Sequence, residues 1–190
     1  MNKKNIIYVV CILILFGVIV RLLPHEPNMT PITAIAFAGS LYLGKKWALV
    51  MPLLVLLLSD LLMGFYDWKI VLSVYGSFAL IGLLSFVAIK FRKVLPVGLS
   101  LIGSSLLFFL ITNAAVWAFS PWYEKTFSGL LYSYELGLPF LRNMLIGDIL
   151  YTVALVSVFE ISYLLYRRRH DLRNALRTSV PAPLLYNKLN

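Results

Sequence analysis

The charged residues of this sequence that could do chemistry are four side chains set in or beside long apolar runs. Arg21, Asp60, Arg142 and Asp148 each fall near the same predicted end of an apolar segment. An ionisable side chain inside a membrane costs about 2.5 kcal/mol or more on insertion scales, so each needs a partner or a purpose. The four charges sum to zero, which leaves two interpretations. Either they form ion pairs between helices, or they line a polar pocket in which a solute replaces part of the network.

Uncharged polar residues gather toward the same level. Ser105, Phe109, Asn113 and Trp117 recur every four residues and share one stripe of a predicted helix. An asparagine in lipid is poorly satisfied unless its stripe faces protein or water. Asn28, Tyr75 and Asn143 add donors and acceptors in the same half. Since the other half is almost all aliphatic, the pattern predicts a pocket open to one side, which is more typical of a solute-binding protein than of a channel.

Catalytic signatures are absent from the sequence. It contains no HExxH, GxSxG or P-loop motif, and its two histidines, His25 and His170, fall on opposite predicted sides of the membrane. The single cysteine, Cys11, excludes a disulfide framework and a CxxC metal site. We therefore predict a protein that is not an enzyme and has no metal or cofactor. An intramembrane hydrolase that uses Asp60 and Asp148 as a carboxylate pair stays open as an alternative.

Composition defines the class of protein. Of 190 residues, 61% are hydrophobic and only 13% are charged, against roughly 25% charged in soluble proteins. The length accommodates about six spans of about 20 residues each, with short loops. We predict an all-α polytopic membrane protein with one transmembrane domain at 1–170 and a cytoplasmic tail at 171–190. The predicted spans are 5–23, 31–44, 47–64, 70–89, 96–119 and 143–166.

The second predicted span, 31–44, is shorter than the others. Its 14 residues give a helix of about 21 Å, less than the roughly 30 Å hydrocarbon core, so it needs help from its flanks. Thr30 is the expected N-cap, with Pro31 at the first helical position.

The basic residues predict which side is cytoplasmic. With the N-terminus inside, Arg21, Lys69, Lys125 and Arg142 are the only four of the seventeen basic residues on the outer side. The inner side holds Lys3, Lys4, Lys45, Lys46, Lys90, Arg92, Lys93, Arg167, Arg168, Arg169, Arg173, Arg177 and Lys188. This asymmetry is typical of a cell-membrane protein, inner or plasma, with both termini cytoplasmic. It also accounts for the net charge of +9 through anionic lipid headgroups, and no nucleic-acid partner is expected.

The segment 122–141 is too interrupted for a span, because it holds two acids, two glycines and Pro139. Its apolar residues nevertheless share an arc at the helical period: Phe127, Leu130, Leu131, Tyr134 and Leu138. We predict an interfacial helix between the fifth and sixth spans. It is either a passive connector or a lid over the pocket.

Several runs carry a resemblance to a known family. These are RLLPHEPNMTPITAIAFAG at 21–39, SD at 59–60, SSLLFFLITNAAVW at 104–117 and PFLRNMLIGD at 139–148. They resemble a family of small bacterial six-helix membrane proteins assigned to transport. That family is similar in size and layout to the substrate-binding S components of energy-coupling-factor vitamin transporters, in particular the solitary cobalamin type.

The resemblance implies a binder of a vitamin-like solute, with His25 as an axial cobalt ligand at the pocket mouth if the solute is a corrinoid. It also implies an energy-coupling ATPase module as partner. The first span lacks the Ala-x-x-x-Ala surface on which such a partner docks, whereas Ala34 and Ala38 have that spacing. A scaffold or assembly protein without transport activity is the main alternative. The predicted substrate-binding residues are Arg21, His25, Asn28, Asp60, Tyr75, Asn113, Trp117, Arg142, Asn143 and Asp148.

Overall fold

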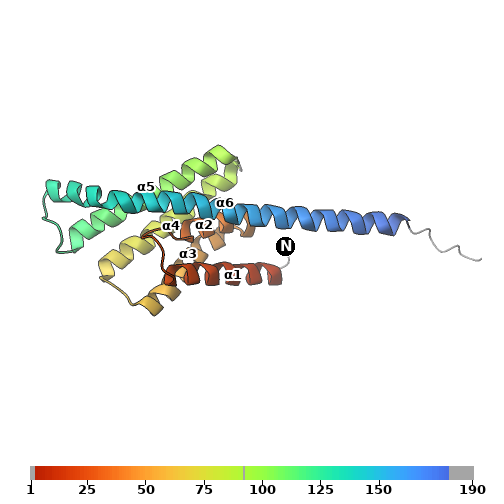
Figure 1. The fold of residues 1–190 in the computed structure, drawn as a ribbon, viewed down its shortest axis with the longest axis horizontal. Helices are drawn as coiled ribbons and strands as arrows, with labels where there is room; N and C mark the ends of the chain where they lie inside the picture. Colours follow the sequence, from red (N-terminus) through yellow and green to blue (C-terminus); the bar gives the residue numbers. More distant parts are fainter. Residues whose placement is uncertain (1–2, 92, 180–190) are drawn as a thin grey trace, which may run out of the picture. The chain divides into compact units, whose positions relative to one another are not determined.

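The computed structural model describes residues 3–91 and 93–179 of the chain. Most of these residues are in helices, which are joined by short loops. Their order along the chain is shown in Figure 1. The helices are α1 (Lys3–Leu22), α2 (Ile32–Ala38), the π-helical turn η1 (Gly39–Leu43), α3 (Lys45–Met63), α4 (Trp68–Phe91), α5 (Val94–Phe119) and α6 (Phe127–Ser179). Among them, α1, α3, α4, α5 and α6 are long and apolar enough to cross a membrane. The predicted all-α, multi-pass class is therefore confirmed.

The short helix α2 with η1 lies in the core of the fold. Residues 31–40 are all buried, so this helix is surrounded on every face, as expected for a segment that is apolar all round. No side chain caps its start, where Pro31 occupies the cap position, so the predicted Thr30 cap is wrong. Ala34 and Ala38 are both 0% exposed. In this conformation they are therefore closed to any docking partner.

Helices α1 and α3 run in the same direction. A Cβ at Gly17 would lie 2.8 Å from the Val55 side chain, and four residues further along both helices Arg21 contacts Ser59 and Asp60. The chain therefore returns, between the end of α1 and the start of α3, through α2 and η1. These twelve helical residues cover only about 18 Å, and the flanking loop supplies the rest of the distance.

Helix α4 runs antiparallel to α3. The Tyr75 hydroxyl, near the start of α4, contacts Asp60 near the end of α3. At the other end of the pair, Gly82 lies against the Ala48 carbonyl. The directions of α1, α3 and α4 place Lys3, Lys4, Lys45, Lys46 and Lys90 at one end of the bundle, away from Arg21. Of the other basic residues assigned to the inner side, Arg92 and Lys188 lie outside the described residues.

The segment predicted as a separate interfacial helix is instead the beginning of α6. From Phe127 the helix runs without a break through Pro139 and packs antiparallel to α5. The face against α5 contains Leu130, Ser133, Tyr134 and Gly137, at the i, i+3, i+4, i+7 spacing of one helix stripe. In contrast, Phe127, Leu131 and Leu138 of the predicted apolar arc are more than half exposed.

Gly137 explains how α6 approaches α5 so closely. A Cβ there would lie 2.5 Å from the Asn113 Oδ1 atom. Nearby, the Tyr134 hydroxyl donates to the Leu110 carbonyl at 3.1 Å, and its ring centroid is 5.5 Å from that of Phe109. The stripe of Ser105, Phe109, Asn113 and Trp117 is thus the α5–α6 interface. Its polar groups are satisfied there by the protein.

The chain divides into two compact units, the first ending at Leu155 and the second beginning at Val156. In the second unit α6 continues to Ser179, well into the tail predicted at 171–190. Within this unit His170 contacts the Asn174 side-chain amide at 3.1 Å and the Tyr166 ring at 6.4 Å between centroids. Residues 180–190 of the predicted tail lie outside the described residues.

The α3–α4 contact can be tested with two alanine substitutions on one helix. A Cβ at Gly82 would lie 2.8 Å from the Ala48 carbonyl oxygen, whereas a Cβ at Gly76 meets nothing within 4 Å. We expect Gly82→Ala to lower the stability to unfolding by about 1–3 kcal/mol through overpacking. Gly76→Ala should be neutral or stabilising by up to about 1 kcal/mol. Thermal unfolding midpoints in detergent compare the two, and equal midpoints would contradict this packing.

Candidate functional site

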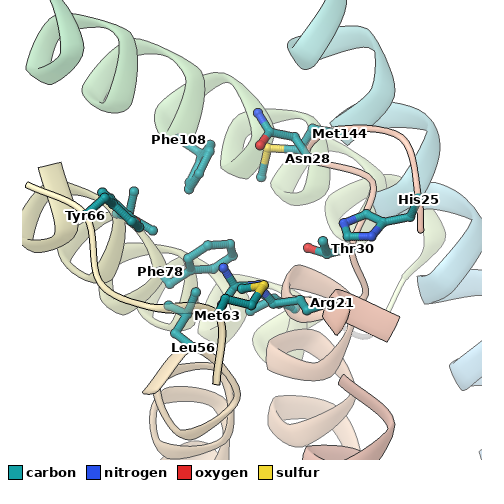
Figure 2. Close-up of a pocket in the computed structure, with 12 residues that line it drawn as sticks. Arg21, His25, Asn28, Thr30, Leu56, Met63, Tyr66, Phe78, Phe108 and Met144 are labelled. Atoms are coloured by element: carbon teal, nitrogen blue, oxygen red, sulfur yellow. The ribbon is translucent and has the colours of Figure 1, made fainter. Parts of the chain in front are cut away.

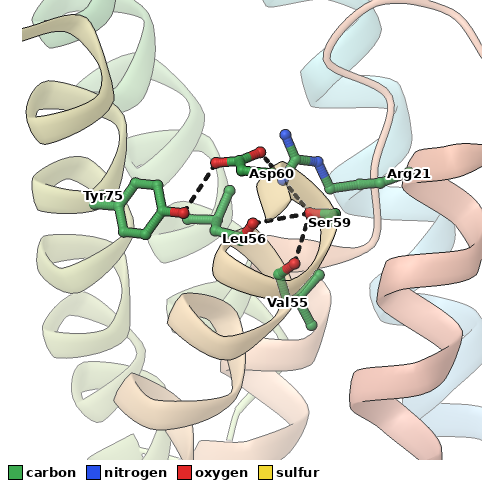
Figure 3. Close-up of polar contacts among 6 residues, drawn as sticks. All are labelled: Arg21, Val55, Leu56, Ser59, Asp60 and Tyr75. Atoms are coloured by element: carbon green, nitrogen blue, oxygen red, sulfur yellow. Dashed lines mark hydrogen bonds and ion pairs between the residues drawn. The ribbon is translucent and has the colours of Figure 1, made fainter. Parts of the chain in front are cut away.

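A buried ion pair joins the ends of α1 and α3. An Arg21 Nη1 atom lies 2.9 Å from Asp60 Oδ1, and the Asp60 side chain is 1% exposed. The Tyr75 hydroxyl donates to Asp60 Oδ2 at 2.9 Å, so both carboxylate oxygens have partners (Figure 3). Removing one member of a buried pair typically costs about 3–5 kcal/mol, because the other charge is left uncompensated. The ion pair and the Tyr75 hydrogen bond therefore hold the adjoining parts of α1, α3 and α4 at the same depth of the bundle.

Ser59 completes this cluster. Arg21 donates to its hydroxyl oxygen, and the hydroxyl in turn donates to the Val55 carbonyl one turn earlier in α3, at 2.6 Å. Arg21 lies in the last turn of α1, where a cation also interacts favourably with the helix dipole. The guanidinium is thus held in one orientation by α3 while its other edge faces the neighbouring cavity.

An open pocket of about 210 Å³ lies beside the ion pair. Figure 2 shows Tyr66, Phe78 and Phe108 around the cavity, with His25 and Thr30 on the loop that closes one side. The polar lining consists of Arg21, His25, Asn28, Thr30 and Tyr66. The apolar lining consists of Ile32, Leu56, Met63, Val74, Phe78, Phe108 and Met144. A few polar groups at one side of an apolar cavity are the usual composition of a small-molecule site.

The loop between α1 and α2 forms the polar wall of the pocket. Asn28 adopts a φ of 64°, a left-handed conformation that asparagine tolerates better than most residues. The loop is closed by a hydrogen bond from the Met29 amide to the Glu26 carbonyl at 3.0 Å, and the Asn143 side chain of α6 donates to the Pro27 carbonyl at 3.3 Å. These contacts attach the loop to α6 and present Asn28 to the cavity.

One ring nitrogen of His25 has no hydrogen-bond partner among the described residues. The other, Nδ1, lies 2.7 Å from the Leu23 carbonyl oxygen. Since a carbonyl can only accept, Nδ1 carries a proton in this contact, and the neutral ring keeps its lone pair on Nε2. His25 can therefore accept a hydrogen bond from a solute or donate its lone pair to a metal centre that a solute carries.

Tyr66, in the short loop after α3, remains a hydrogen-bond donor. Burial raises the pKa of its hydroxyl above the usual value, and the nearby charge of Asp60 raises it further, while Arg21 acts in the opposite direction. The phenol is therefore protonated at physiological pH. A donor at this position complements the acceptor on His25.

Asp148 lies outside this pocket. Its carboxylate is 2% exposed and accepts a hydrogen bond of 2.7 Å from Ser105 of α5, with a second from Thr33 of α2. Ser105 is near the middle of α5, so Asp148 lies near mid-depth of the bundle and not at the level of Arg21. No hydrogen bond joins it to Asp60 within the described residues, and the proposed carboxylate pair has no support in this geometry.

Of the ten predicted residues, Arg21, His25 and Asn28 line the pocket, and Asp60 and Tyr75 support Arg21 from behind. The others lie elsewhere. Asn113 donates to the Phe109 carbonyl within α5, Trp117 donates to the Glu124 carbonyl, and Asn143 holds the loop from outside. Arg142 is exposed and forms no ion pair with any residue that the structure describes.

Sequence reasoning missed the apolar floor and two polar lining residues, Thr30 and Tyr66. Leu56 and Met63 are seven residues apart and so share a face of α3, and Val74 and Phe78 share one of α4. That spacing is indistinguishable from ordinary core packing. No group of three or more His, Cys, Asp or Glu side chains suited to a metal ion occurs within 3–91 and 93–179.

The fold and the apolar spans define a multi-pass helical membrane protein. Residues 1–171 match a family of unknown function (DUF6580), and the chain belongs to that family. No curated protein and no solved structure matches the chain. The family model assigns no activity to these residues.

The ion pair can be tested by removing one partner and then both. We expect Arg21→Gln to destabilise the protein by about 3–5 kcal/mol, because Asp60 stays buried without a counter-charge. The double variant Arg21→Met, Asp60→Leu should recover most of this loss. Thermal unfolding measures each variant, with the exposed Arg142→Gln as control, expected within about 0.5 kcal/mol of the parent. Additive losses in the double variant would exclude coupling between the two residues.

Proposed function

We propose that the protein is a membrane-embedded solute-binding protein that takes part in the uptake of a small, vitamin-like molecule through a pocket facing the outside. One observation carries the proposal: an open pocket with a polar wall and an apolar floor lies at the end of the bundle opposite most of the lysines of the first unit. The positive-inside rule assigns that end to the outer side.

The lining suggests the chemistry of the solute. Arg21 is already neutralised by Asp60, so the pocket has no free charge to attract a strong anion. Donors on Asn28, Thr30 and Tyr66 and an acceptor on His25 favour a neutral polar group, while the aromatic floor favours an apolar or planar ring. The solute is then an amphipathic molecule with its polar group toward the loop.

The volume limits the size of what is enclosed. Pockets that bury drug-sized ligands are about 300–1,000 Å³, larger than this one. A corrinoid would place only one edge here, with His25 Nε2 available as its axial ligand. A smaller vitamin or cofactor precursor would be enclosed more completely, and we favour that class.

The two alternatives have weaker support. A scaffold without a ligand is consistent with the internal pairing of Asp60, but it gives no reason for an open pocket beside that pair. A hydrolase would need two carboxyls that share a site, whereas Asp60 and Asp148 bond to different partners. An ATPase partner, if one energises uptake, must use a surface other than Ala34 and Ala38.

Filling the pocket should weaken solute binding without unfolding the protein. Phe108→Trp adds bulk to the pocket floor, whereas Leu110→Trp adds the same side chain at a position of α5 that is 51% exposed. We expect parent and Leu110→Trp to bind the same solute from a panel of vitamins, cobinamide and cobalamin, with at least a tenfold weaker affinity in Phe108→Trp, equivalent to about 1.4 kcal/mol.

Calorimetry on purified protein measures the affinities, and size-exclusion profiles confirm folding of each variant. If no member of the panel binds the parent, the scaffold is favoured. If Phe108→Trp and Leu110→Trp bind equally well, the ligand site is elsewhere.

A further inference from the structure

Asp148 is a buried carboxyl with no counter-charge. Its partners are hydroxyls, Ser105 on α5 and Thr33 on α2, which are 0% and 1% exposed. No lysine, arginine or histidine contacts it within the residues that the structure describes. The titratable group one turn further along α6, Tyr151, packs its ring edge-on against Phe16 of α1.

Such a carboxyl is expensive in the middle of a membrane. Hydroxyl donors do not supply the charge that a bare carboxylate needs in a medium of low dielectric constant. The other fully buried acid, Asp60, has Arg21 for this purpose. Asp148 therefore needs one positive charge from outside the protein.

Thr152 provides a second, independent observation. Its hydroxyl is buried, with 5% of the residue exposed, and it has no hydrogen-bond partner among the described residues. It follows Asp148 by four residues on α6, so the two side chains share a face of the helix. Helix side chains lean toward the N-terminus, so the Thr152 side chain leans toward Asp148. An unpartnered buried hydroxyl costs about 1–3 kcal/mol, so its retention needs a reason.

We propose that Asp148, Ser105, Thr33 and Thr152 form a binding site for one monovalent cation, taken either as a proton on the carboxyl or as a sodium ion held by the four oxygens. Carboxylate and hydroxyl oxygens are hard ligands suited to such ions. A single carboxylate matches a single charge. A divalent ion is disfavoured because the recorded partners of Asp148 among the described residues are hydroxyls and include no second acid.

The cation site is connected to the pocket by two helices. Ile32 lines the pocket and Thr33, the next residue of α2, bonds to Asp148. On α6, Met144 lines the pocket one turn before Asp148. A change at Asp148 therefore acts next to residues that line the pocket. The last step rests on the proposed function. If the protein takes up a solute, binding of the cation is coupled to binding of the solute.

The cation site is tested without any solute, so its failure is distinct from failure of the proposed function. Purified full-length protein in detergent is unfolded thermally, first across pH without sodium, then at fixed pH with sodium replacing N-methylglucamine at constant ionic strength. A ligand that binds only the folded state raises the unfolding midpoint. Infrared spectroscopy reports the carbonyl band of a protonated carboxyl directly.

Sodium occupancy predicts a midpoint that rises with sodium concentration. Proton occupancy predicts no sodium effect, and instead a protonated-carboxyl band that disappears with rising pH. Either response must be absent in Asp148→Asn and retained in Glu135→Gln, an exposed acid on the same helix. The proposal is overturned if the parent shows neither response, or if Asp148→Asn keeps it.

Thr152→Val keeps the test decisive if Asp148→Asn does not fold. Valine has nearly the shape of threonine but lacks the hydroxyl. We expect the apparent affinity for sodium, or for the proton, to fall about tenfold, the equivalent of one lost hydrogen bond. An unchanged affinity would remove Thr152 from the site and overturn the proposed four-oxygen arrangement.

Discussion

The ion pair between Arg21 and Asp60 sets the register on which the rest of the bundle depends. It lies near the ends of two parallel helices, and two parallel neighbours in one chain require a return path between them. That path is α2 with η1, a helix too short to cross by itself and enclosed by its neighbours. The cost of separating the two charges in lipid therefore maintains an arrangement that apolar packing alone would not specify.

The pocket is a consequence of the same arrangement. The loop that joins α1 to α2 borders the cavity, and its residues Asn28 and Thr30 form part of the wall. The floor is closed by Phe78 and Phe108, whose ring centroids lie 5.1 Å apart. The cavity therefore lies between the loop that leads into the short helix α2 and the apolar faces of α3, α4 and α5.

The sequence predicts the long apolar helices well, because each of them coincides with a long run of residues that contains few charges. Predicted spans 5–23, 47–64, 70–89 and 96–119 differ from α1, α3, α4 and α5 by at most two residues at either end. The start of α6 was missed for a physical reason. Glu135 and Pro139 are exposed and leave the stripe against α5 intact, so a drop in hydropathy did not end the helix.

The wrong start of α6 also gave a wrong depth for Asp148. Counting from residue 143 placed Asp148 at the outer end of a span, whereas a helix beginning at Phe127 and packed along α5 places it opposite Ser105 near mid-depth. The grouping of Arg21 with Asp60 followed from charge alone and is confirmed. Arg142, which was grouped with them, is exposed and forms no ion pair with any residue that the structure describes.

The two fully buried acids, Asp60 and Asp148, differ in whether a counter-charge accompanies them. Asp60 has a permanent counter-charge, so an anionic solute would have to displace it from Arg21 and leave it buried and unpaired, a cost that selects against anions in the pocket. Asp148 has only hydroxyls, so its charge state is free to follow an exchangeable ion. Asp60 therefore keeps a fixed charge that holds α1 and α3 together. Asp148 is the buried group, among the described residues, whose charge can change without breaking an ion pair.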